Sequence, residues 1–108
     1  MNRKELLLDL IRYKNPIEQT LQRLQKYEWD SSEIVMLTKK EIVEILDRCL
    51  QGEFEYSQIE NWATSLEVRE DIQLGEQEKE IIHILANPKL YGELNKEAIS
   101  KIKIELEQ

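Results

Sequence analysis

Carboxylates are the reactive groups that this sequence concentrates. Residues 53–80 hold nine acidic residues and two basic ones, whereas acids and bases balance in residues 1–52 and in residues 81–108. The whole formal charge of −7 therefore lies in that one segment. A concentration of one charge sign attracts ligands of the opposite sign and speeds their encounter. The segment is consequently the candidate surface for binding a basic partner.

Three of these acids have the spacing of one helix face. Glu60, Glu67 and Asp71 stand at i, i+7 and i+11, so on a helix they would lie within about 40° of one another and form a ridge about 16 Å long. An ordinary solvated helix face is the alternative, although like charges at such spacings destabilise a helix and call for a reason. The residues predicted to contact a partner are Glu53, Glu55, Glu60, Glu67, Glu70 and Asp71, with the aromatic residues Phe54 and Tyr56.

The two aromatic residues leave two interpretations open. Phe54 and Tyr56 flank Glu55 in a short link between two predicted helices. On a protruding turn they would serve as anchors at an interface. Folded back under the turn, they would pack against the protein's own core instead.

Catalytic chemistry has little support. His83 and Glu80 are the one combination that suggests an acid–base couple. However, His83 lies opposite the apolar side of its predicted helix and has no paired nucleophile, so a solvated surface histidine is expected. Cys49 is either a reactive thiolate or an inert buried thiol within an apolar stripe. We expect no catalytic residues and no enzyme activity.

The composition also restricts the ligands. The sequence has no Cys/His cluster, calcium loop or phosphate-binding glycine motif, so we expect neither a metal nor a cofactor. The acidic balance argues against nucleic acid and anionic membranes as partners. No stretch approaches the roughly 20 apolar residues of a membrane span. No signal peptide is recognised and there is one cysteine, which together favour the cytoplasm.

Apolar residues at helical spacing predict the elements that would position these groups. We expect helices to begin near residues 3, 17, 39, 58, 76 and 96, with capping boxes at Thr38–Glu41 and Ser57–Glu60. The helices on either side of Gly52 would form an antiparallel pair. Residues 28–37 are expected to be irregular or extended, residues 72–75 a link and residues 90–94 a loop. The fold class is therefore all-α (mainly α): residues 1–108 form a compact single-domain bundle of five to six short helices.

Several segments together resemble a known family. They are Tyr27–Asp30, Leu37–Thr38, Leu46–Glu53, Ile59–Ala63, Glu67–Ile72 and Ile84–Pro88. Across residues 27–94 this pattern of caps, aromatics and acids is similar to small acidic bacterial proteins that include immunity proteins of the contact-dependent growth inhibition (polymorphic toxin) type. The resemblance implies a cytoplasmic inhibitor of a toxin domain, often a nuclease with a basic cleft.

Two functional hypotheses follow. The first is a non-catalytic immunity protein that neutralises a basic toxin or nuclease domain, such as a tRNA-cleaving or other RNase, through its acidic helical face. The second is a structural or adaptor module that meets its partner through Trp29, Phe54 and Tyr56. The oligomeric state is left open.

Overall fold

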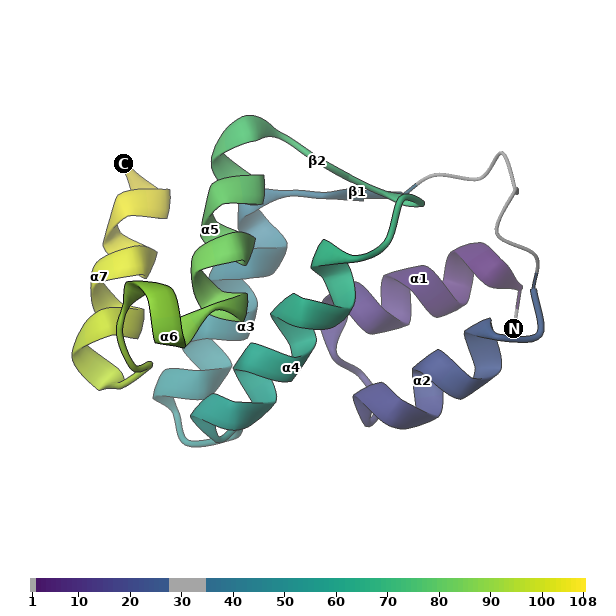
Figure 1. The fold of residues 1–108 in the computed structure, drawn as a ribbon, viewed down its shortest axis with the longest axis horizontal. Helices are drawn as coiled ribbons and strands as arrows, with labels where there is room; N and C mark the ends of the chain where they lie inside the picture. Colours follow the sequence, from purple (N-terminus) through teal and green to yellow (C-terminus); the bar gives the residue numbers. More distant parts are fainter. Residues whose placement is uncertain (1, 28–34) are drawn as a thin grey trace.

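Helices dominate the computed structural model, which describes residues 2–27 and 35–108 (Figure 1). This confirms the expected mainly α class. The predicted turn at Trp29–Ser32 lies outside the described residues. The described elements are, in order, α1 (Arg3–Arg12), α2 (Ile17–Leu24), β1 (Val35–Leu37), α3 (Lys39–Leu50), α4 (Tyr56–Glu67), β2 (Ile72–Leu74), α5 (Glu76–Ala86), α6 (Pro88–Tyr91) and α7 (Lys96–Glu107).

The two short strands are the main departure from the predicted elements. β1 and β2 pair in parallel, with Val35 opposite Ile72 and Leu37 opposite Leu74. Residues 72–74, expected as a link, are thus a strand, and residues 35–37 take the extended one of the two conformations left open. The α6 helix also replaces the start of the loop expected at residues 90–94. The crossover between the strands consists of α3 and α4, so the acidic segment begins inside it.

The helices pack in a different pairing from the one predicted. The chain does reverse direction between α3 and α4, but α4 packs most extensively against α5, and α3 against α7. Figure 1 shows α1 and α2 together at the N-terminal end of the molecule, with α4 between them and α5. Trp62 on α4 joins these parts: its side chain is fully buried, and its indole N–H donates to the backbone carbonyls of Leu10 (3.0 Å) and Ile11 (3.1 Å).

The ends of α3 follow the sequence signals. Thr38 and Glu41 form the predicted capping box at its start. At its end Gly52 has φ +88°, a conformation in which a Cβ would be strained. The N–H of Gly52 donates to the carbonyl of Cys49 and the N–H of Glu53 to that of Arg48. These are the two bonds of a Schellman motif.

The bounds of α4 differ from the prediction at both ends. Its capping box is formed by Glu55 and Gln58, so the helix begins at Tyr56, earlier than a cap at Ser57 would allow. The helix ends at Glu67, with Val68 as its C-cap. The predicted ridge therefore loses its last turn, because Asp71 is no longer on the helix. Within the described part of the chain, no helix has the length and apolar character needed to cross a membrane.

Candidate partner-binding surface

Asp71 does not belong to the surface at all. Its residue is 5% exposed, and its carboxylate accepts from Arg3 Nη2 at 2.5 Å and from Arg69 Nε and Nη2 at 2.9 Å each. The predicted ridge of Glu60, Glu67 and Asp71 is therefore wrong. Asp71 instead ties α1 to the residues just before β2. We call Arg3, Arg69 and Asp71 the buried ion cluster.

The environment of Asp71 favours its charged form. Burial alone opposes ionisation, but the hydrogen bond and charge of Arg69, together with the charge of Arg3, outweigh it and hold the pKa of Asp71 below its usual value. A carboxylate that stays ionised between two guanidinium groups is fully engaged within the fold. It has no capacity left to bind a partner.

Two further acids of the predicted set also have intramolecular contacts. Glu53 forms an ion pair with Arg48, and Glu55 caps the start of α4. Glu70 is exposed but lies beyond the end of the helix, so it is not part of a ridge.

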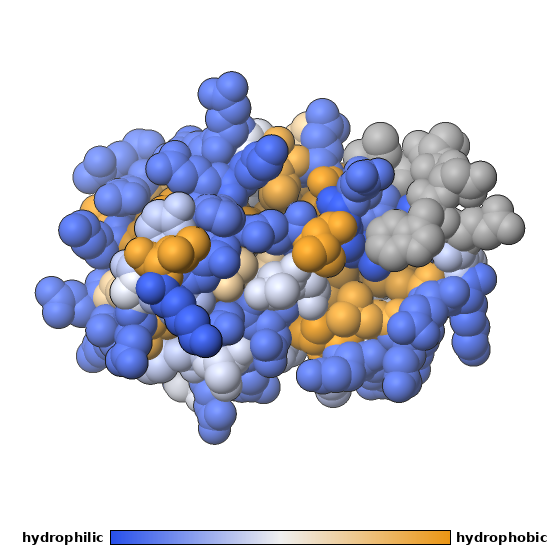
Figure 2. All heavy atoms as spheres, in the orientation of Figure 1, coloured by the Kyte–Doolittle hydropathy of each residue, from blue (hydrophilic) through white to orange (hydrophobic). Residues whose placement is uncertain are grey.

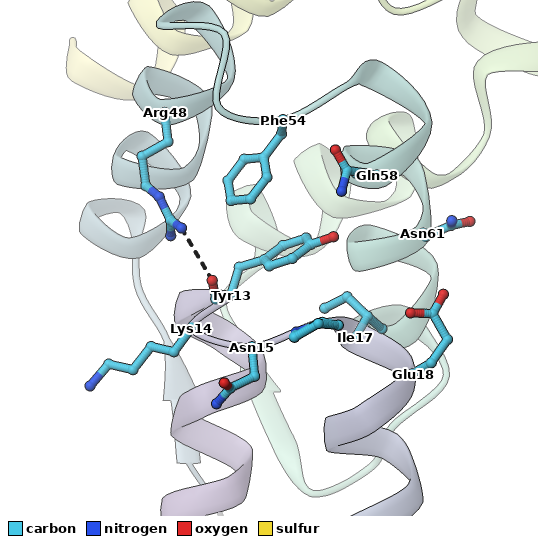
Figure 3. Close-up of a pocket in the computed structure, with 10 residues that line it drawn as sticks. Tyr13, Lys14, Asn15, Ile17, Glu18, Arg48, Phe54, Gln58 and Asn61 are labelled. Atoms are coloured by element: carbon cyan, nitrogen blue, oxygen red, sulfur yellow. Dashed lines mark hydrogen bonds between the residues drawn. The ribbon is translucent and has the colours of Figure 1, made fainter.

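Phe54 folds back onto the protein, which decides between its two predicted roles. Its half-buried ring lies 4.3 Å from the Tyr13 ring between centroids, and Arg48 Cζ lies 4.5 Å from its centroid. Figure 3 shows these three side chains at the mouth of a cavity of about 310 Å³. Arg48 also donates to the carbonyls of Arg12 (2.7 Å) and Tyr13 (3.2 Å).

These contacts hold the end of α1. Tyr13 is its C-cap and has φ +51°, which is uncommon for a residue with a side chain. A guanidinium bonded to the last carbonyls of a helix satisfies unpaired acceptors and suits the negative end of the dipole. Burial raises the pKa of the Tyr13 hydroxyl, against the effect of its hydrogen bond to Gln58. The cavity in Figure 3 thus lies where the end of α1 and the start of α2 meet α3 and α4.

Glu60, Glu67 and Tyr56 remain on the surface as predicted, and α5 and α6 add residues around them. At the C-terminal end of α4, a hollow of about 350 Å³ lies between this helix and the first turns of α5. We call it the α5 hollow. At the N-terminal end of α4, a groove of about 560 Å³, the α6 groove, contains Tyr56 and Glu60. The α5 hollow is lined by Glu67, Leu74, Glu76, Lys79, Glu80, Ile82 and His83, and the α6 groove by Tyr56, Ser57, Glu60, Pro88, Lys89, Gly92, Glu93 and Leu94.

His83 lies between Glu67 on α4 and Tyr91 on α6. Its Nδ1 lies 2.9 Å from Glu67 Oε2, and its ring meets the Tyr91 ring edge-on at 5.6 Å between centroids. Asn87 Nδ2 donates to the His83 carbonyl at 2.8 Å. The same amide nitrogen lies 3.2 Å from His83 Nδ1. Because a carboxylate can only accept, the hydrogen bond to Glu67 requires a hydrogen on Nδ1, an assignment inferred from the hydrogen-bond network. The partner of His83 is therefore Glu67 on α4 and not Glu80, which lies one turn away on α5.

We call the α5 hollow, Tyr91 and the α6 groove together the α4–α6 strip. Its lining carries five carboxylates (Glu60, Glu67, Glu76, Glu80 and Glu93) and two ammonium groups (Lys79 and Lys89). Figure 2 views the molecule with α4, α5 and α6 toward the reader, and shows a mostly hydrophilic surface with several apolar patches, the broadest on the side of α1 and α2. Sequence reasoning found the acids of α4 but missed Glu76, Glu80 and Glu93 as site residues. Glu76 and Glu80 stand on the predicted helix that begins near residue 76, whereas Glu93 lies in the loop after α6, so no common local signal marks the three.

Reactive-group chemistry is limited in the described residues. Cys49 is buried, and burial raises the pKa of its thiol, which disfavours the nucleophilic thiolate. No group of three or more His, Cys, Asp or Glu side chains in residues 2–27 and 35–108 has the arrangement of a metal site. The exposed functional groups are therefore suited to binding by charge and hydrogen bonding.

No family model, curated protein or solved structure matches this chain. The surface of the protein and the resemblance in its sequence are therefore what supports a function.

Proposed function

We propose that this protein is a non-catalytic immunity protein that acts in the cytoplasm and neutralises a basic toxin domain, such as a tRNA-cleaving or other RNase. The observation that carries the proposal is the α4–α6 strip, where five carboxylates and two ammonium groups line depressions at the two ends of α4. A nuclease cleft that binds phosphates presents Lys and Arg, so its charge is complementary to this strip.

The inhibition would need binding alone. Carboxylates of the strip would occupy the positions that the phosphates of the nucleic acid take in the toxin cleft. Complementary charge also steers the two proteins together, and raises the association rate far above that of a neutral pair. Rapid capture suits an inhibitor, because every free toxin molecule continues to cleave its substrate.

A toxicity-rescue experiment tests this function. The product of the neighbouring gene, or its C-terminal domain, is expressed alone and together with this protein. We expect growth arrest without the protein, growth with it, and a purified complex whose association slows as salt is raised. Failure of the protein to bind the toxic product or to restore growth would refute the proposal.

A double charge-reversal variant tests whether the α4–α6 strip is the surface that binds the toxin. Glu60→Lys with Glu67→Lys should weaken the complex by about 2–5 kcal/mol, mainly through faster dissociation. The matched control is Glu97→Lys with Glu105→Lys, which makes the same charge change at exposed positions of α7. Equal loss in both variants would mean that net charge, and not the strip, governs binding.

A second function, an adaptor module, is favoured by a different observation. Leu90 and Tyr91 on α6 are 72% and 54% exposed, and Tyr91 belongs to the strip, where its ring meets that of His83. Apolar anchors of this kind carry much of the binding energy at many interfaces. Under this hypothesis, Leu90→Ser with Tyr91→Ser abolishes binding and salt has little effect, whereas Ile104→Ser on α7 leaves binding unchanged.

A further inference from the structure

The α5 hollow has an apolar floor and an acidic rim. Its floor is apolar, with Ile82 fully buried and Leu74 half-buried. Its rim carries the carboxylates of Glu67, Glu76 and Glu80. The volume of about 350 Å³ is at the low end of the range for ligand pockets. An occupant must therefore be small, apolar along part of its length and positive at its end.

The local charges support a cation. Lys79 is the one ammonium group among the hollow's described lining residues, against three carboxylates. The start of α5 contributes positive partial charge, but Glu76 and Glu78 in its first turn offset it. Because Glu67 is held by His83 at 2.9 Å, its position on the rim is fixed before a ligand arrives. A fixed acceptor loses less entropy on binding than a freely rotating one.

We propose that the α5 hollow receives one arginine side chain from the basic toxin domain, an inference that rests on the proposed function. The methylene stem lies along Leu74 at the apolar floor, and the guanidinium bonds to the rim carboxylates. Arginine fits better than lysine because its planar fork pairs with carboxylates through two hydrogen bonds. Its guanidinium is also more weakly hydrated, so it loses less on entering a depression with an apolar floor.

A peptide titration tests the hollow without the toxin. Acetyl-Gly-Arg-Gly-amide is added to the isotopically labelled protein, and the methyl signals of Leu74 and Ile82 and the ring signals of His83 are followed by NMR. We expect shifts at these three residues that saturate at millimolar peptide. The same peptide with citrulline, which keeps the shape and removes the charge, should produce at least tenfold weaker binding.

Matched variants locate the effect. Glu76→Gln with Glu80→Gln keeps the side-chain size at exposed positions and should abolish the shifts. Glu97→Gln with Glu105→Gln makes the same charge change on α7 and should leave them intact. A third peptide, acetyl-Gly-Lys-Gly-amide, carries lysine in place of arginine. The arginine assignment would be overturned if the citrulline peptide bound equally well, if the lysine peptide bound more tightly, or if the shifts were confined to other residues.

The complex with the toxin separates this inference from the proposed function. If the toxin binds wild-type protein and the Glu76→Gln, Glu80→Gln variant equally well, the arginine site is wrong and the immunity function stands. If the toxin binds neither, the function fails, and the peptide titration still decides the hollow. We expect the variant to bind the toxin at least tenfold more weakly than wild type.

Discussion

The buried ion cluster and the α5 hollow use carboxylates from one acidic segment in opposite ways. Asp71 is enclosed with two guanidinium groups, whereas Glu76 and Glu80 face solvent around an apolar floor. Asp71 stands only four positions after Glu67, which lies on the hollow's rim. Charge along a sequence therefore does not reveal whether a carboxylate holds the fold together or is available to a partner.

The two regions should also differ in how much stability the protein loses when a charge is removed. Removing one member of a buried ion pair leaves its partners charged and without compensation. Removing an exposed carboxylate leaves water to solvate whatever remains. Stability should thus depend strongly on Asp71 and weakly on the acids of the hollow, while binding should show the reverse dependence.

The largest effect is expected for Asp71→Asn. It removes the buried carboxylate that both Arg3 and Arg69 bond, so the free energy of unfolding should fall by about 3–5 kcal/mol. Urea denaturation followed by circular dichroism measures it. Glu70→Gln, at the adjacent exposed position, is the control and should stay within about 0.5 kcal/mol of wild type. A similarly small change for Asp71→Asn would contradict the structural role of the cluster.

Lowering the pH should reproduce part of the stability loss expected for Asp71→Asn. The pKa of Asp71 is lowered in the folded protein, so its contribution to stability is complete above the unfolded value of about 3.9. That contribution disappears as the pH falls from about 4 through the lower, folded pKa. Urea midpoints measured across this range should fall less steeply for Asp71→Asn than for wild type. Identical slopes for the two proteins would show that Asp71 is not responsible.

The smallest effect on stability is expected at the hollow. Glu76→Gln and Glu80→Gln, made singly, should each change the free energy of unfolding by no more than about 0.5 kcal/mol. Glu80→Gln should fall on the stabilising side, because it relieves repulsion with Glu76 one turn away. The melting temperature from calorimetry provides the measurement. A large loss in either variant would place that carboxylate with Asp71 as part of the fold.

Local signals in the sequence sufficed for most helices. The apolar stripes and caps located α3 and α5, and they placed Trp62 in the core, because both depend on neighbours within one or two turns. The α4 helix shows the limit of this approach. Its start depends on which of two overlapping boxes forms, Glu55–Gln58 or Ser57–Glu60. Its C-terminal end is set by the point at which the chain turns toward β2.

Long-range pairing accounts for what was missed. A three-residue strand is too short to show alternation, and β1 finds its partner 37 residues further along the chain. Asp71 was assigned to the surface because Arg3, which helps to bury it, lies 68 residues away. The strip likewise depends on long-range packing, since α5 lies against α4 and α6 against α5, and no local pattern relates Glu67 to His83.

The contact between Arg3 and Asp71 also bears on the order in which the protein can be completed during translation. A ribosome that adds about 5–20 residues per second needs roughly 3–14 s to proceed from residue 3 to residue 71. During that interval α1 exists without the Asp71 carboxylate, and before Trp62 is made it also lacks the indole that packs on its last turn. The surroundings of α1 are therefore completed only after a much later part of the chain has been synthesised.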